Sequence, residues 1–262
     1  QALIGSPKML ASGTRMGTAR SWGRRTSATW RPMLLKMLSG ETRSHGAWKV
    51  EKRGSTEEKS DPALIHTIPY QQASKRLLQL YERVKGPDNN VDNIMLAHSL
   101  RPHTMEGHMA LYKSVLHHKD NKIPKGFLET IGVWVSGMNG CSYCVEHHYA
   151  GLCRLVGKEK GSQIRRSLES GNIESGPFSS REKQALQYVE ILTLSPESSF
   201  VEPIEDLRKV GFNDGEILEI NQVAAYFSYA NRSVQGLGVT CDGDILGLSP
   251  NNAERLDDWA HS

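Results

Sequence analysis

Hydrophobic residues between positions 62 and 250 recur three or four positions apart, which is the spacing of a helix face, and strand-like alternation does not compete with it. The pattern predicts helices over residues 71–85, 104–118, 124–136, 141–156, 159–170, 179–194, 203–210 and 213–236. Capping pairs mark two of the starts, Ser179 with Glu182 and Asn213 with Glu216. The sequence therefore predicts an all-α domain.

Cysteine and histidine repeat at helical spacing in the middle of this region. Cys141, Cys144 and His148 occupy positions 0, 3 and 7 of one predicted helix, so they share a face. Two thiols one turn apart can close a disulfide, and an imidazole one turn further can act as a base. The Asn139-Gly140 turn puts Cys141 at the helix start, where unpaired N–H groups and the macrodipole lower the pKa of a thiol. This arrangement predicts a redox dithiol.

A single acidic residue stands in the preceding predicted helix, over residues 124–136. Glu129 lies twelve positions before Cys141, and the turn between them should fold its helix back against the dithiol helix. A carboxylate there would hold His148 in one tautomer and raise its basicity, as in nucleophile–base–acid triads. We expect Glu129 to orient His148.

Two other kinds of site also use Cys-x-x-Cys. Zinc could be bound by Cys141, Cys144, His148 and either Glu129 or His147, although the chain has no second Cys-x-x-Cys and no His-x-x-x-His to complete a structural site. A thioredoxin-like domain needs a βαβ context that the helical periodicity does not offer. The redox dithiol on a helical scaffold is the favoured interpretation, with no metal expected.

The sequence from Glu129 to His148 resembles the signature of the alkylhydroperoxidase D-like (carboxymuconolactone decarboxylase-like) superfamily: Glu, eleven residues, Cys-x-x-Cys, three residues, His. Residues 101–112, 139–148, 178–183, 225–232 and 236–238 resemble its peroxidase-related branch, and the resemblance covers residues 62–250. Tyr143 precedes the second cysteine, where the founding alkylhydroperoxidases carry histidine and the peroxidase-related branch usually carries tyrosine.

The resemblance implies an all-helical alkylhydroperoxidase D-like bundle with a CxxC-bearing helix, assembled into homo-oligomers, either trimers or hexamers. It also implies a thiol peroxidase mechanism, in which Cys144 attacks the peroxide and becomes a sulfenic acid and Cys141 resolves it as a disulfide. His148 and Glu129 would move protons. No bound cofactor is implied, because an external thiol or dithiol reductant protein restores the pair.

Other polar residues receive weaker assignments. His147 could flank the site or face solvent, and Asn231 with Arg232, deep in a helical pattern, indicates a buried polar contact at the site or at a subunit interface. Cys153 and Cys241 are expected to be bystanders. Five histidines fit no standard ligand spacing and are expected on the surface or in polar networks: His98, His103, His108, His117 and His118.

Composition limits the partners and the location of the protein. A net charge of +3 over 262 residues is too small to indicate nucleic acid, and no apolar run is long enough for a transmembrane segment. Residues 1–40 hold seven Lys and Arg and no acidic residue, as in a mitochondrial transit peptide or a docking arm. The expectation is a mitochondrial, matrix-side protein, with a cytoplasmic one as the alternative. Residues 41–61 read as a linker and residues 251–262 as a polar tail.

The sequence thus predicts a peroxiredoxin-type thiol peroxidase with an antioxidant role. The alternative is an accessory subunit of a larger organellar assembly, with residues 1–40 as its docking arm. Carboxymuconolactone-type decarboxylation is disfavoured, because relatives with that activity work without the dithiol.

Overall fold

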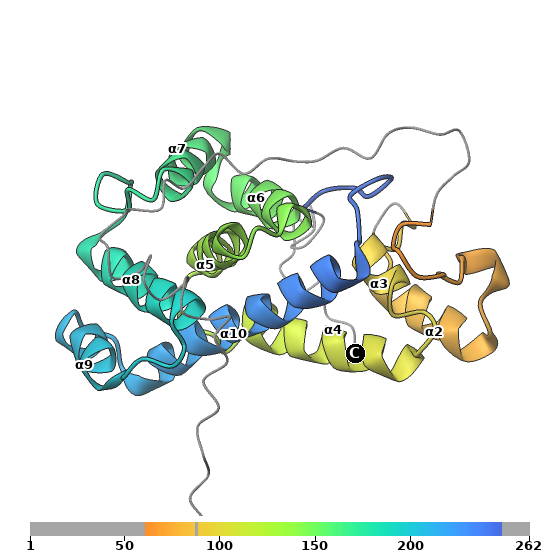
Figure 1. Ribbon diagram of the computed structural model, residues 1–262, viewed down its shortest axis with the longest axis horizontal. Coiled ribbons are helices and arrows are strands. Elements are labelled where there is room, and N and C mark those ends of the chain that lie inside the picture. The colour runs from red at the N-terminus through yellow and green to blue at the C-terminus, as the bar shows by residue number, and fades with distance from the viewer. Residues whose placement is uncertain (1–60, 87–88, 248–262) are drawn as a thin grey trace, which may run out of the picture. The chain divides into compact units, whose positions relative to one another are not determined.

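The computed structural model describes residues 61–86 and 89–247, and no strand occurs in these ranges. The helices are α2 (Lys75–Val84), α3 (Asn93–Leu96), α4 (Pro102–Tyr112), α5 (Lys125–Met138), α6 (Ser142–Val156), α7 (Lys158–Glu169), α8 (Ser180–Leu194), α9 (Val201–Lys209) and α10 (Asp214–Leu237) (Figure 1). A 3-10 turn at Tyr70–Gln72 precedes α2, and a π-helical turn at Lys113–His117 follows α4. The predicted all-α fold is confirmed.

Several predicted features lie outside the described residues. These are the basic extension at residues 1–40, the linker up to residue 60 and the polar tail at residues 251–262. The domain limits inferred from the sequence therefore stay predictions. Within the described ranges, none of the helices has the length and apolar character needed to cross a membrane.

Both predicted capping boxes are present. Ser179 Oγ accepts a hydrogen bond from the backbone N–H of Glu182, and the Glu182 carboxylate accepts one from the backbone N–H of Ser179. Asn213 and Glu216 make the same reciprocal pair at the start of α10. Each pair satisfies two backbone donors that the helix itself leaves unbonded, so local chemistry determines where α8 and α10 begin.

Two predicted helices have different boundaries in the structure, and one short helix was not predicted. The first long helix begins at Lys75 rather than near residue 71, because Ser74 caps it by accepting a hydrogen bond from Leu77 N. The helix predicted over residues 104–118 begins at Pro102, whose ring suits the first helical position, and ends in the π-helical turn. The short α3 was not predicted at all, since four residues give no measurable periodicity.

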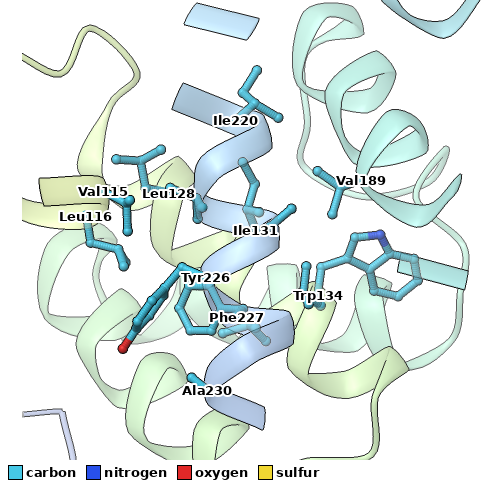
Figure 2. Close-up of a cluster of buried hydrophobic side chains, with 14 of the residues drawn as sticks. Val115, Leu116, Leu128, Ile131, Trp134, Val189, Ile220, Tyr226, Phe227 and Ala230 are labelled. Carbon is cyan, nitrogen blue, oxygen red and sulfur yellow. The ribbon is translucent and has the colours of Figure 1, made fainter. Parts of the chain in front are cut away.

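The buried helix α5 packs against α6, α8 and α10 (Figure 1). Every residue from Phe127 to Gly137 is buried, as expected for a helix that is apolar nearly all round. Figure 2 shows Ile131 and Trp134 of α5 between Val189 of α8 and Phe227 of α10. This burial is what carries the one carboxylate on α5, Glu129, into the interior.

Glycine lets α5 and α10 approach closely. A Cβ atom added at Gly132 would overlap the ring of Phe227, so no larger residue fits there without displacing the ring. The same Phe227 ring meets the imidazole of His148 edge-on, with centroids 4.5 Å apart. The packing of two core helices therefore also fixes a site residue.

Candidate active site

A tight turn between α5 and α6 positions the two cysteines. Gly140 has φ +70°, a left-handed conformation that glycine adopts without strain, and Cys141 N then donates to Ser136 O at 2.8 Å. Cys141 becomes the residue that caps α6, and Cys144 lies one turn further. Both thiols are buried and free, with their Sγ atoms hydrogen-bonded at 2.9 Å.

Glu129 and His148 come together as the sequence suggested. Glu129 Oε2 lies 2.7 Å from His148 Nδ1, and the carboxylate is fully buried while the imidazole is 14% exposed. This contact fixes the orientation of the His148 ring and leaves Nε2 as the nitrogen that is not bonded to Glu129. Glu129 Oε1 is buried without a hydrogen-bond partner among the described residues, so the His148 contact is the main compensation for burying this carboxylate.

The two thiols differ in acidity. The hydrogen bond with Cys144 lowers the pKa of Cys141, because a neighbouring S–H stabilises the thiolate, and the side chain of Asn231 lowers it further. Burial raises the pKa of Cys144 well above its ordinary value. In the reduced pair, Cys141 is therefore the thiol that ionises first, although the resemblance to the alkylhydroperoxidase D-like superfamily implies that Cys144 attacks.

One cavity reaches Cys144. Its lining residues come from α2, α3, α4, α6, α10 and the last described segment: Val84, Asp92, Ile94, Met95, His108, Met109, Tyr112, Tyr143, Cys144, His147, His148, Tyr226, Ala230 and Gly247. The cavity offers about 60 Å³ to the centres of water-sized molecules, and one such molecule needs roughly 10–15 Å³. A hydrogen peroxide molecule or the head of a small organic peroxide fits. Cys141 does not line it.

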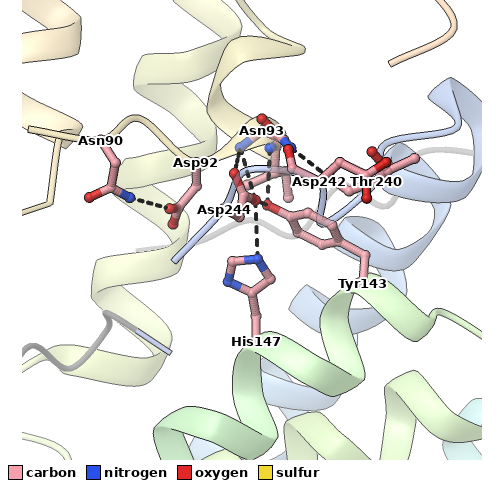
Figure 3. Close-up of polar contacts among 9 residues, drawn as sticks. Asn90, Asp92, Asn93, Tyr143, His147, Thr240, Asp242 and Asp244 are labelled. Atoms are coloured by element: carbon pink, nitrogen blue, oxygen red, sulfur yellow. Dashed lines mark hydrogen bonds and ion pairs between the residues drawn. The ribbon is translucent and has the colours of Figure 1, made fainter. Parts of the chain in front are cut away.

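The segment after α10 bonds to the dithiol helix through Asp244 (Figure 3). Asp244 Oδ2 accepts a hydrogen bond from Tyr143 OH at 2.7 Å and lies 3.1 Å from His147 Nε2. The backbone N–H of Asn93 donates to both Asp244 oxygens, at 3.0 and 3.1 Å. The rings of Tyr143 and His147 stack with centroids 4.4 Å apart. Four polar contacts therefore hold the carboxylate, and the stacking holds the two rings against each other.

A second carboxyl, that of Asp92, lines the cavity. Asp92 stands at the N-cap position of α3, but its side chain accepts no helix N–H, and its Oδ1 accepts a hydrogen bond from Asn90 Nδ2 at 3.1 Å (Figure 3). Burial raises the pKa of Asp92 to about 6, against the opposing effect of a charged His147. This carboxyl therefore titrates close to neutral pH beside Cys144 and both histidines.

Sequence reasoning missed Asp92 and Asp244. Asp92 stands among Asn and Asp residues and Asp244 among Gly and Asp residues, patterns that are typical of solvent-exposed turns. Neither belongs to a recognisable motif. The only available signal was that Asp244 follows the last core helix closely enough to fold back on it.

Asn231 and Arg232 lie in different surroundings. Asn231 is fully buried, donates to Ser136 Oγ at 3.0 Å and accepts from Asn139 Nδ2 at 2.9 Å, which braces the turn before Cys141. Arg232 is exposed and donates to Ser228 O of its own helix, so it makes no buried contact among the described residues, and a role at a subunit interface stays a prediction. Adjacent helix residues point about 100° apart, so only one of the two faces the interior.

The remaining cysteines lie in different surroundings. Cys153 contacts the α7 residue Gly161, away from the pair. Cys241 packs against the small apolar cluster that contains Cys141 and Cys144, and burial raises its pKa to about 12. Cys241 thus lies nearer the pair than its position in the sequence indicated.

The five other histidines divide by burial. His108 is buried and lines the cavity, with Nε2 3.2 Å from Tyr226 OH, and burial lowers its pKa to about 3. The ring of His98 lies beside it, with centroids 5.1 Å apart. His117 is half-buried and packs edge-on against Tyr112, whereas His103 and His118 are exposed. Across residues 61–86 and 89–247, no three His, Cys, Asp or Glu side chains are grouped so that they could hold a metal ion.

The comparisons with known proteins found similarity in structure but not in sequence. No protein-family model matches the chain, and no curated protein matches it either. The alkylhydroperoxidase core of a peroxidase-related protein from Ralstonia eutropha JMP134 matches with a TM-score of 0.60 and 23% identity, over 68% of this chain and 91% of its own. A peroxidase-related protein from Silicibacter sp. TM1040 gives 0.61 and 23%, over 71% of this chain and 95% of its own.

A third structural neighbour has a different printed activity. It is a debrominase, solved with a cysteine replaced by alanine and 2,3,4-tribromopyrrole bound, with a TM-score of 0.52, 17% identity, and coverage of 63% of this chain and 85% of its own. All three share the helical arrangement described above. The chain therefore has the fold of the alkylhydroperoxidase D-like, peroxidase-related proteins.

Proposed function

We propose that this chain is a thiol-dependent peroxidase of the alkylhydroperoxidase D-like superfamily, which reduces hydroperoxides by cycling Cys141 and Cys144 between dithiol and disulfide. One observation carries the proposal: two free thiols 2.9 Å apart, one of which opens on a cavity shared with a carboxylate-bound imidazole. A sulfur exposed to a small cavity and a second sulfur in contact with it are what such a cycle requires.

In the first half of the cycle, the Cys144 thiolate attacks the terminal oxygen of the hydroperoxide. The O–O bond breaks, an S–O bond forms, and the departing oxygen takes a proton and leaves as an alcohol or water. Cys141 then attacks the Cys144 sulfenic acid, which releases water and leaves a disulfide. An external thiol or dithiol returns both sulfurs to the reduced state by thiol–disulfide exchange.

The difference in acidity between the thiols suits this order of events. Cys141 ionises first, and its thiolate lies within hydrogen-bond distance of the Cys144 S–H. The proton of Cys144 can therefore pass to Cys141 or to the free nitrogen of His148, which lines the same cavity. Cys144 becomes the nucleophile because it faces the peroxide, while Cys141 is buried behind it.

The assay is peroxide consumption with dithiothreitol as reductant. Cys144→Ser should lose turnover by about 100-fold or more, because an alcohol replaces the nucleophilic sulfur. In a single-turnover reaction without dithiothreitol, Cys141→Ser should accumulate a sulfenic acid that dimedone traps, since no second thiol resolves it. Cys153→Ser, a thiol on the same helix away from the pair, is the matched control and should keep the wild-type rate. Equal rates for wild type and Cys144→Ser would contradict the proposal.

A second substrate class belongs in the same assay. One structural neighbour is a debrominase, and its bound ligand is 2,3,4-tribromopyrrole. Bromide release from 2,3,4-tribromopyrrole by the reduced protein, with no consumption of peroxide, would replace peroxide reduction as the proposed activity.

The alternative of an accessory subunit is kept because of the basic residues 1–40. A free enzyme should elute from a sizing column as a homo-oligomer of three or six copies, whereas a subunit should co-purify with unrelated chains.

The expected localisation in mitochondria is tested by fusing residues 1–40 to a fluorescent protein.

A further inference from the structure

Two adjacent histidines on α6 each carry a buried carboxylate partner. His148 Nδ1 lies 2.7 Å from Glu129 Oε2, with side chains 14% and 0% exposed. His147 Nε2 lies 3.1 Å from Asp244 Oδ2, with side chains 10% and 2% exposed. The carboxylates reach the histidines from different directions, one from α5 and the other from the segment after α10. Both imidazoles line the same cavity, and each is held by its own carboxylate.

The two rings are held by opposite nitrogens. Glu129 bonds Nδ1 of His148, so Nε2 is left, whereas Asp244 bonds Nε2 of His147, so Nδ1 is left. No other described residue makes a hydrogen bond to either remaining nitrogen. Both rings line the cavity that reaches Cys144, so each pair has one nitrogen for a proton carried to or from a bound peroxide.

Peroxide reduction requires two proton transfers with opposite directions. The attacking thiol must lose a proton, and the departing oxygen must gain one, because an alkoxide or hydroxide is a poor leaving group. A single imidazole that takes the thiol proton can in turn deliver it to the oxygen, as in nucleophile–base–acid triads, but one nitrogen must then reach both the sulfur and the departing oxygen. Two fixed imidazoles at one cavity can divide these tasks, each with its own remaining nitrogen.

On the basis of the proposed peroxidase function, we infer that His147, held by Asp244, is the general acid that protonates the leaving oxygen, while His148 with Glu129 serves the thiol. In this step the Cys144 thiolate forms the S–O bond, the O–O bond breaks, and its electron pair goes to the departing oxygen. That oxygen takes the proton from His147, which ends neutral. Asp244 acts through His147 and is a positioning residue.

The surroundings of His147 fit this role. Asp244 cannot turn away from the ring, because Tyr143 OH and the backbone N–H of Asn93 hold the carboxylate as well (Figure 3). The titratable groups that line the cavity together with His147 include Asp92 from the start of α3, Tyr143 and His148 from α6, and His108 from α4. Asp92 is close enough that a charged His147 opposes the rise in its pKa caused by burial, and the resulting pKa is about 6. This carboxyl can return a proton to the ring after each turnover.

The test separates the two proton transfers by the choice of leaving group. With tert-butyl hydroperoxide, the leaving group is an alkoxide, which needs a proton. With peracetic acid, the leaving group is acetate, which does not. Single-turnover loss of thiols is measured for the reduced full-length chain with each oxidant. General acid catalysis typically contributes ~10²–10⁴-fold, so His147→Gln should slow the tert-butyl hydroperoxide reaction by at least ~100-fold and the peracetic acid reaction by less than ~3-fold.

Three further variants complete the design. His148→Gln should slow both reactions alike, because thiol ionisation precedes both. Asp244→Asn keeps an oxygen that can accept the hydrogen bond from Tyr143. It should slow the tert-butyl hydroperoxide reaction selectively, as His147→Gln does, but by roughly one tenth of the factor. His118→Gln, an exposed histidine, should leave both rates unchanged. Circular dichroism and the melting temperature show whether each variant is folded.

The outcomes distinguish the inference from the function it rests on. A wild type that reacts with neither oxidant overturns the peroxidase proposal and the inference together. If the wild type reacts but His147→Gln slows both reactions equally, the inference alone is overturned. The same holds if His147→Gln slows neither reaction. If His147→Gln does not fold, the leaving-group selectivity of Asp244→Asn decides, and equal effects on both oxidants reject the role.

Discussion

Asp92 is the residue whose charge most directly links stability to pH. Its ordinary pKa of 3.8 rises to about 6 in the fold, chiefly because of burial, so the folded chain holds this proton more tightly than the unfolded chain. The free energy of unfolding therefore falls as pH rises from 4 to 6 and stays lower above that. A shift of about two pKa units corresponds to a cost of about 3 kcal/mol at pH 8.

Asp92→Asn should remove this cost. We expect the variant to be more stable than wild type by about 1–3 kcal/mol at pH 8, with the difference shrinking as pH falls toward 4. Urea denaturation of both proteins at matched pH measures it. The two proteins are compared at matched pH because His108 also makes stability depend on pH. Burial lowers the pKa of His108 to about 3, so its contribution to the free energy of unfolding rises with pH, opposite to that of Asp92. Asp120→Asn, at an exposed carboxylate, is the control, and a constant difference across pH would contradict the prediction.

The residues that the sequence placed correctly are those linked by local geometry. Cys141, Cys144 and His148 share a helix face, and Glu129 meets them through one turn between consecutive helices. Asp244 lies 97 positions from His147, in a segment with no motif. No local sequence pattern therefore predicts the contact between them. The sequence alone thus predicted one imidazole–carboxylate contact and could not predict the second.

At the scale of elements, the packing of α5 on α10 controls both stability and the site. Gly132→Ala should cost about 1–3 kcal/mol, because the added methyl overlaps the Phe227 ring in a filled core. Phe227 would move toward His148, which it touches edge-on, so the peroxide reaction should slow as well. Chemical denaturation and the single-turnover rate measure the two effects.

The matched control is another helical glycine. Gly107 is exposed in α4 and nothing lies within 4 Å of an added Cβ, so Gly107→Ala should stabilise the chain by about 0.5–1 kcal/mol and leave the rate unchanged. If both alanine variants had the same stability, the close approach of α5 and α10 would not be the constraint inferred here.

Helix starts were predictable where a side chain determines them and not where tertiary contacts do. The capping boxes at Ser179 and Asn213 are read directly from residues three positions apart. The short α3 is instead held by Asn93, whose side chain donates to Thr240 O at 2.7 Å, a contact across 147 positions. Such a helix exists because of its partners, so its own residues carry no pattern that predicts it.

At the scale of the whole molecule, the core and the candidate site belong to the same stretch of chain. The main buried cluster extends from Leu77 to Ala230, and the site residues lie between Asp92 and Gly247. The structural neighbours from Ralstonia and Silicibacter cover 68% and 71% of this chain and nearly all of their own. A unit of this size, with a contiguous core, buries enough apolar surface to be stable alone.

We therefore expect residues 61–250, produced without the basic extension and the tail, to unfold in one cooperative transition and to keep the wild-type peroxide rate. The melting temperature should stay within a few degrees of that of the full chain, since hydrophobic burial supplies most of the stability of a domain. Thermal denaturation and the dithiothreitol-coupled assay test this directly. A shortened chain that is folded but inactive would mean that residues 1–60 or 251–262 contribute to the site, and the one-domain interpretation would have to be abandoned.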